Sequence, residues 1–126
     1  MNLYARPVPD VRFTFPPSRR LSGKLAFRRV FDASRRAHKF PLTVWVDDND
    51  LDHPRLGLSI GKKIGHAPRR SRLKRKLREA FRLTQHELPA VDLVVTGKPH
   101  DDLPLEAYVK LLTKLATRAV REQPRR

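Results

Sequence analysis

The sequence predicts an α+β domain in which helices cover a β-sheet. Three segments have the apolar pattern of strands: 40–46, 55–60 and 91–96. Three others have apolar residues at helical spacing: 23–33, 68–84 and a last helix that begins at Pro104 or Leu105. Because strands separated by helices bury their apolar faces against those helices, this alternation favours one sheet under a helical layer.

The first helix is expected over residues 23–33, with Ser22 as its N-cap. Its apolar stripe consists of Ala26, Phe27, Val30 and Phe31. Pro41 then marks the start of the strand 40–46, since proline is tolerated at the first residue of a strand or at a sheet edge. In that strand Leu42, Val44 and Val46 lie on one face, and Thr43 and Trp45 on the other.

The next strand, 55–60, places Leu56, Leu58 and Ile60 on one face. The short connection before it contains the acidic run "DDNDLD", residues 47–52. Its length favours an antiparallel hairpin between the two strands. A charged hairpin tip is the preferred interpretation of the acids. A calcium loop is the weaker alternative, because the glycine and the terminal glutamate of such a loop are missing.

The helix 68–84 begins with Pro68, which the first turn of a helix tolerates, and is followed by the buried-type strand 91–96, ended by Gly97. The last helix carries a stripe of Tyr108, Val109, Leu112, Leu115, Ala116 and Ala119. Outside these elements, residues 1–17 form a proline-rich extension, in which "VRFTF" could add a short edge strand. We expect the domain itself to span 18–122, and residues 123–126 to be a basic tail.

Composition limits the function. The chain has 126 residues, a net charge of +15 and no cysteine. The missing cysteine excludes disulfides, cysteine-containing zinc sites and thiol catalysis. Because self-repulsion at this charge destabilises a compact state, we expect a polyanionic partner. There is no apolar run long enough to cross a membrane and no secretory signal, so we expect a cytoplasmic protein that does not bind membranes.

The charge is concentrated before and within the helix 68–84. Nine of the seventeen residues from Lys62 to Arg78 are Lys or Arg, and none is acidic. At about 100° per residue, Leu73, Leu77, Ala80 and Phe81 form one apolar arc, and the cations cover most of the rest. A solvated, salt-bridged helix would need alternating signs, but Glu79 is its one acid. The pattern therefore favours binding of nucleic-acid phosphates.

The segment "RLGLSIGKKIGHAPRRSRLKRKLREAF" resembles the signature of the bacterial ribonuclease P protein subunit. The matching residues are Lys62, Lys63, Gly65, Ala67, Arg70, Arg72, Lys74, Arg75 and Arg78. The resemblance extends to "RLSGKLAFRRVF" before this segment and to "DLVVTGKP" after it. Ser71 stands where the family usually has Asn, and its side chain has one fewer polar atom.

The resemblance implies an αβββαβα sandwich: a four-stranded mixed sheet covered by helices, with a left-handed βαβ crossover, as in a ribosomal-protein domain. It implies a subunit of an endoribonuclease that binds a catalytic RNA and the 5′ leader of precursor tRNA, and assists removal of that leader. The partners are then ribonuclease P RNA and precursor tRNA, with one protein per RNA. The Mg²⁺ ions would be held mainly by the RNA, with no cofactor bound tightly by the protein. The alternative is a ribosomal or ribosome-assembly protein without enzymatic role.

Two sets of site residues follow. The expected contacts with catalytic RNA are Lys62, Lys63, Arg69, Arg70, Ser71, Arg72, Lys74, Arg75 and Arg78. The expected leader cleft consists of Phe27, Phe31, Trp45 and Thr43, where bases would stack on the aromatic rings. The alternative for the two Phe residues is that they pack the first helix onto the sheet. We identify no catalytic residue in the chain: the five His residues lack metal-ligand spacing, and whether the protein binds metal stays open.

Overall fold

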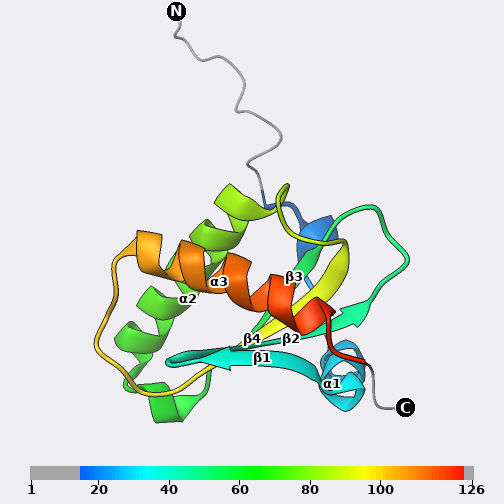
Figure 1. The fold of residues 1–126 in the computed structure, drawn as a ribbon. Helices are drawn as coiled ribbons and strands as arrows, with labels where there is room; N and C mark the ends of the chain where they lie inside the picture. The colour runs from blue at the N-terminus through cyan, green and yellow to red at the C-terminus, as the bar shows by residue number, and fades with distance from the viewer. Residues whose placement is uncertain (1–14, 124–126) are drawn as a thin grey trace, which may run out of the picture.

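The computed structural model describes residues 15–123, which fold around one sheet (Figure 1). The helices are α1 (Lys24–Ala33), α2 (Ala67–Thr84) and α3 (Leu105–Val120). The strands are β1 (Arg35–Lys39), β2 (Leu42–Asp48), β3 (Arg55–Ser59) and β4 (Val91–Gly97), and two short 3₁₀ turns are η2 (Pro17–Arg19) and η3 (Lys62–Ile64). The predicted order αβββαβα is confirmed. No described helix is long and apolar enough to cross a membrane.

The strand order in the sheet is β1-β2-β4-β3. β2 pairs antiparallel with both β1 and β4, and β3 pairs parallel with β4. Residues Val91 to Val95 of β4 are all buried, which explains why this strand lies inside the sheet rather than at an edge. The connection from β3 to β4 therefore joins two parallel neighbours through α2.

The predicted hairpin between residues 40–46 and 55–60 is wrong, because β4 lies between β2 and β3. The actual hairpin joins β1 to β2 through a turn at Phe40 and Pro41. Asn49 pins the β2–β3 connection across the end of β4: its Nδ2 donates to Asp92 Oδ1 at 3.0 Å and to the His53 carbonyl at 3.1 Å.

Two other local predictions differ from the structure. The N-cap of α1 is Gly23, not Ser22; Gly23 has φ 94°, and its carbonyl accepts the first helical hydrogen bond from Phe27 N. β1 escaped the residue pattern because Ala37 is its one apolar residue. Its inward-facing Arg35 is buried, and that side chain donates to Asp48 Oδ1 and to the Val120 carbonyl.

The sheet has a fully covered face and a partly covered one. α2 and α3 pack on the first, where Leu42, Val44 and Val46 are fully buried, as predicted. The predicted apolar arc of α2 is confirmed: Leu73, Leu77, Ala80 and Phe81 are all inaccessible to solvent. The second face carries α1, which contacts β2 and β4. There the core is small, with Leu21, Val30 and Val94 buried.

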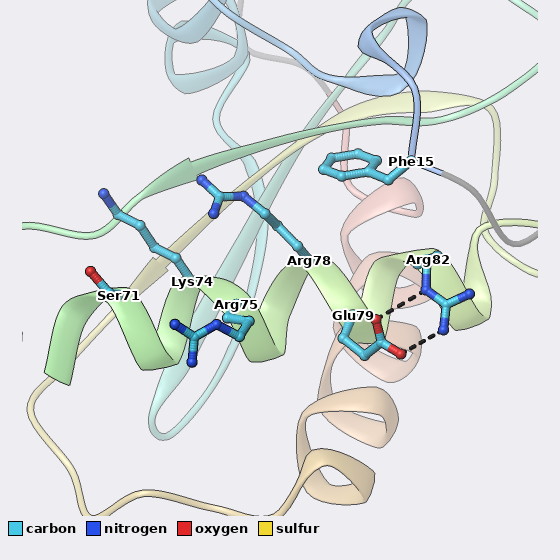
Figure 2. A pocket seen from close by; sticks show the side chains of 7 residues that line it. All are labelled: Phe15, Ser71, Lys74, Arg75, Arg78, Glu79 and Arg82. Carbon is cyan, nitrogen blue, oxygen red and sulfur yellow. Dashed lines mark hydrogen bonds and ion pairs between the residues drawn. The ribbon is translucent and has the colours of Figure 1, made fainter. Parts of the chain in front are cut away.

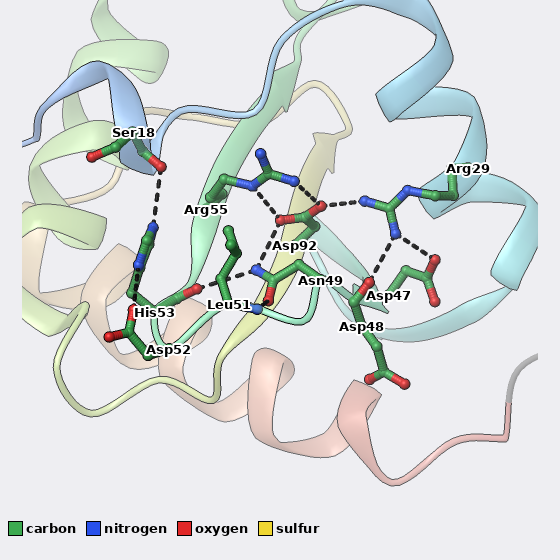
Figure 3. Close-up of polar contacts among 10 residues, drawn as sticks. All are labelled: Ser18, Arg29, Asp47, Asp48, Asn49, Leu51, Asp52, His53, Arg55 and Asp92. Atoms are coloured by element: carbon green, nitrogen blue, oxygen red, sulfur yellow. Dashed lines mark hydrogen bonds and ion pairs between the residues drawn. The ribbon is translucent and has the colours of Figure 1, made fainter.

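An ionic network holds α1 on this second face (Figure 3). Arg29 of α1 donates to Asp47 Oδ2 at 2.6 Å and also pairs with Asp92. Arg55 of β3 binds Asp92 through two hydrogen bonds of 2.8 Å. Burial opposes ionisation of Asp92, but the bonds from Arg55 and Asn49 outweigh it and lower the pKa of this carboxyl.

The network also revises the prediction of a charged tip at residues 47–52. Asp47 and Asp48 belong to β2, and Asp47 is buried beneath α1. Only residues 49–52 lie in the connection itself. The described residues contain no group of three His, Asp or Glu that could hold a metal ion.

Candidate nucleic-acid interface

The cationic surface begins where β3 ends. Lys62 and Lys63 form the short turn η3, whose buried Ile64 anchors it to the core. Gly65 follows with φ 145°, a conformation that favours glycine, and leads the chain into α2. The expected position of Pro68 in the first turn of the helix is confirmed. This sequence places two lysines directly beside the N-terminal end of the cationic helix.

Most of the predicted cations face solvent and have no partner within the described chain. Lys62, Lys63, Arg72, Arg75 and Arg78 are exposed, and Lys74 is partly buried. None of the six forms a hydrogen bond or an ion pair with another described residue. Because the opposite side of α2 is fully buried, their charge is fixed in one direction, where phosphate groups can reach it.

Arg69 and Lys76 lie on the α3 side of the helix and are engaged within the chain. Arg69 Nη2 donates to the His100 carbonyl at 2.8 Å, and its Nη1 lies 3.7 Å from Asp102. Lys76 Nζ donates to Asp102 Oδ2 at 2.8 Å and to the Leu103 carbonyl at 2.7 Å. These two cations therefore fix α2 against the β4–α3 connection. Arg70 differs, because its Nε is buried without a hydrogen-bond partner.

A groove runs along the outward face of α2 (Figure 2). It is lined by Phe15, Ser71, Lys74, Arg75, Arg78, Glu79 and Arg82. Ser71 is exposed among the cations. Glu79 binds Arg82 at 2.6 Å, and this bond lowers the pKa of the glutamate. Because the acid of the groove is neutralised by its neighbour, the groove as a whole stays cationic.

Phe15 forms one wall of the groove. Its ring packs edge-on against Phe81 of α2, with the ring centroids 5.3 Å apart. The Arg20 guanidinium lies 5.0 Å from the centroid of the Phe15 ring. The last residues of the proline-rich extension thus pack on the domain. The possible strand at residues 11–15 lies almost wholly outside the described residues.

The predicted leader cleft lies on the other face of the sheet. A shallow, mainly apolar groove beside α1 is lined by Gly23, Lys24, Phe27, Arg28, Phe31 and Ser59. Gly57 of β3 allows Phe27 to approach the sheet closely, because a Cβ atom at Gly57 would lie 2.6 Å from the Phe27 ring. The outer end of the Phe27 ring therefore lies close to the backbone of β3, and both Phe rings stay partly exposed at the groove.

Trp45 is partly buried and does not line the groove itself, but it packs beside Phe31, which does. Its ring packs edge-to-face with Phe31 at 5.0 Å, and the Arg36 guanidinium lies 5.0 Å from its centroid. Trp45 Nε1 donates to Thr96 Oγ1 at 3.1 Å. Thr43 lies further along β2, where its Oγ1 is 2.8 Å from His38 Nδ1. The structure thus brings Phe27, Phe31 and Trp45 together and leaves Thr43 at the margin.

A third hollow connects the two surfaces. Its lining includes Phe15, Lys74 and Arg78 from the α2 side, and Gly23 and Phe27 from the α1 side. One polyanion could thus contact both surfaces without leaving the protein.

Sequence reasoning missed Gly57, Arg36 and Phe15. A glycine inside a strand often marks close approach of another group, so Gly57 carried a usable signal. The other two depend on contacts between segments far apart in the chain, which no local pattern reports.

Comparison with known proteins agrees with this geometry. The sequence model of the family described as Ribonuclease P matches residues 15–120. The ribonuclease P protein component of Serratia proteamaculans is 42% identical over 116 residues, which cover 90% of this chain and 98% of that protein. That of Haemophilus influenzae is 40% identical over 113 residues, 88% of this chain and 95% of that protein.

Solved structures give the same result. The RNase P protein of Thermotoga maritima matches with a TM-score of 0.69 and 28% identity, over 78% of this chain and 96% of that one. A mutant RNase P protein of Staphylococcus aureus matches with a TM-score of 0.72 and 25% identity, over 79% of this chain and 86% of that one. On its sequence and on its fold alike, the chain belongs to the ribonuclease P protein family.

Proposed function

We propose that this chain binds ribonuclease P RNA through the cationic surface of η3 and α2, and the 5′ leader of precursor tRNA through the aromatic groove beside α1. The observation that carries the proposal is the separation of the two surfaces. Unpaired cations suited to phosphates lie on α2, and aromatic rings suited to bases lie on the opposite face of the sheet.

The division of labour follows from the same chemistry. Folded RNA presents a dense array of phosphates, which Arg and Lys bind without reading bases. A single-stranded leader exposes its bases, which stack on Phe and Trp with little dependence on sequence. The hollow between the two surfaces offers the RNA a path from one to the other.

We propose that the reacting centre lies in the RNA, as the resemblance implies. The carboxylates Asp47 and Asp92 are bound to arginines, so they do not fit a Mg²⁺ ion. We propose that the RNA subunit holds the Mg²⁺ ions of the reaction and that this chain positions substrate. We also propose a cytoplasmic location and one protein per RNA, as the resemblance implies.

Binding measurements test the proposal. The chain, assembled with ribonuclease P RNA, should bind a precursor tRNA more tightly than the matching mature tRNA, and the RNA alone should discriminate less. Equal discrimination with and without the chain would contradict a leader site on the protein. A ribosomal or ribosome-assembly role is not favoured, because the relatives on both sequence and structure are ribonuclease P proteins.

A further inference from the structure

A second cationic surface lies on α3, away from both proposed sites. Lys110, Lys114, Arg118 and Arg121 are exposed and fall within an arc of about 80° at 100° per residue. This arc lies opposite the buried stripe of Tyr108, Leu112, Leu115 and Ala119. The acids of this segment, Glu106 and Glu122, lie before and after this row of cations, which we call the α3 stripe.

Lys39 of the edge strand β1 extends this surface. Lys39 pairs across the sheet with Leu42, on the face that α2 and α3 cover, and it follows the buried Arg35 and Ala37 at alternate positions of β1. The neighbouring Lys39, more than the charge of Arg118, lowers the pKa of Lys114. Within the described chain, none of the five cations forms an ion pair with an acid. Like charges held together in this way repel one another, and an anion between them would relieve the repulsion.

Helix electrostatics explains only part of the stripe. Arg118 and Arg121 lie at the C-terminal end of α3, where cations are favoured by the helix dipole. Lys110 and Lys114 lie in the middle of the helix, and Lys39 lies on a strand, so the dipole gives them no such benefit. The helix dipole therefore does not explain why these three lysines lie together.

The position of the stripe indicates which RNA would reach it. β1 is the edge of the sheet, and its residues point alternately to the two faces. Lys39, paired with the core residue Leu42, lies on the α3 face of the sheet, whereas Arg36 points to the opposite face and stacks on Trp45 beside the aromatic groove. A single-stranded RNA that leaves the groove past Trp45 and crosses β1 would therefore meet Arg36 and then Lys39.

The N-terminal end of α3 is different. Asp101, Asp102 and Glu106 precede or begin the helix, and Asp102 binds Lys76 and Arg69 of α2. This acidic segment separates the α3 stripe from the proposed site for catalytic RNA. Charge continuity thus runs from the stripe to the leader groove across β1.

We propose that Lys39, Lys110 and Lys114 bind phosphates of the distal 5′ leader, upstream of the nucleotides held in the aromatic groove. This inference rests on the proposed function, because it requires the leader to occupy that groove. The stripe from Lys110 to Arg121 is about 16 Å long at 1.5 Å per residue, enough for several phosphates of an extended strand. Long leaders should then bind more tightly than short ones.

Three ligands test the proposal on the assembled ribonucleoprotein. They are mature tRNA, a precursor with a leader of about 4 nucleotides and a precursor with a leader of about 20, lengths chosen around the range of single-strand sites. The test variant is Lys39→Gln/Lys110→Gln/Lys114→Gln, and the matched control is the charge-retaining Lys39→Arg/Lys110→Arg/Lys114→Arg. Dissociation constants are measured as a function of salt, and circular dichroism checks folding.

The Gln variant should lose on the order of tenfold in affinity for the long-leader precursor at low salt, and its salt slope should flatten by about 0.7 per lost phosphate contact. The short-leader precursor and mature tRNA should bind as they do to the unsubstituted protein, and the Arg variant should bind all three ligands normally.

An unchanged affinity of the Gln variant for the long-leader precursor would overturn the proposal. Equal losses for all three ligands would instead place the body of the tRNA on the stripe, and weaker assembly with ribonuclease P RNA would place that RNA there; either result also overturns it. The proposed function fails separately, if the unsubstituted assembly does not prefer the short-leader precursor to mature tRNA.

Discussion

Trp45 is held by the chain and is also available to a ligand. Phe31, Arg36 and Thr96 fix its ring, and it nevertheless stays partly exposed beside the groove. A ring that is already positioned loses little conformational freedom when a base stacks on it. This arrangement suits a binding residue better than a mobile exposed ring would.

Truncation of this side chain tests the leader groove. Trp45→Ala should weaken binding of a leader-bearing precursor by about 1–3 kcal/mol, the range for loss of a stacked base. Binding of mature tRNA should change little. The comparison is made by titrating labelled RNAs with the assembled ribonucleoprotein.

Phe40→Ala is the matched control, because Phe40 is an aromatic residue 60% exposed that lines a different hollow, with Pro41, His100 and Leu103. It should leave the discrimination between precursor and mature tRNA intact. If a folded Trp45→Ala protein also retained full discrimination, Trp45 would be a packing residue on the sheet.

Asp92 is a structural residue by the same kind of reasoning. Its fully buried carboxylate binds Arg55, Asn49 and Arg29, so it joins β4, β3 and α1. Asp92→Asn should lower the free energy of unfolding by about 1–3 kcal/mol, the cost of leaving buried polar groups with poorer partners. The cost is limited because the Arg29 and Arg55 side chains are 38% and 30% exposed and water can reach them.

The contribution of Asp92 to the free energy of unfolding depends on pH, because only its ionised form binds the arginines. The pKa of Asp92 is lowered in the folded protein, so its contribution is complete above the ordinary value of about 3.9 and is lost as the pH falls through the lowered folded value. Urea unfolding should therefore show a stability gap between the two proteins that is constant near neutrality and closes in acid. A gap that widened in acid would show that the carboxylate is not the stabilising form.

At the scale of elements, α2 was the most predictable part of the molecule. Its apolar arc, its first turn and its last residue all follow from a strong helical pattern in a long segment. The helical pattern could not distinguish the cations that face solvent from the cations that form bonds within the chain. Arg69 and Lys76 differ from Arg75 only through the β4–α3 connection, which is close in space and distant in sequence.

This difference yields a matched comparison on one helix. Lys74→Ala removes an ammonium without a partner in the described chain, whereas Lys76→Ala removes one bound to Asp102 and Leu103. Lys74→Ala should weaken binding of ribonuclease P RNA and flatten its salt slope by about 0.7–0.9, the contribution of one phosphate. Lys76→Ala should leave the slope nearly unchanged.

Arg72→Ala and Arg75→Ala should behave like Lys74→Ala, for the same reason. Filter binding at several salt concentrations gives each slope. Slopes that are the same for all four variants and the unsubstituted protein would mean that α2 does not bind the RNA through phosphates.

The strands were less predictable, for physical reasons that concern pairing. β4 could be recognised as buried, but nothing in residues 91–96 says that it inserts between β2 and β3. That arrangement depends on Asn49 and Asp92, which meet only in the folded chain. β1 could not be recognised from its own residues and was implied only by the family resemblance, because its buried Arg35 is stabilised by Asp48 and the end of α3 rather than by apolar packing.

In the whole molecule, a single sheet separates the cationic surface of α2 from the aromatic surface beside α1, the two sites that we propose bind RNA. α2 and α3 cover one face completely, and α1 covers the other only in part. The incomplete cover leaves Phe27, Phe31 and Trp45 accessible, at the cost of a small second core that the Arg29–Asp92 network reinforces. The aromatic surface and the stability of α1 are therefore linked.

We propose that this chain is the protein subunit that supports cleavage by a catalytic RNA, and a cleavage assay tests this role directly. Precursor tRNA is incubated at low Mg²⁺ with ribonuclease P RNA alone, with the RNA-free chain alone, and with both. We predict cleavage at the mature 5′ end only when both are present, because cations on α2 help the RNA where Mg²⁺ is scarce and the groove holds the leader. Cleavage by the RNA-free chain, or no stimulation of the RNA by the folded chain, would contradict this role.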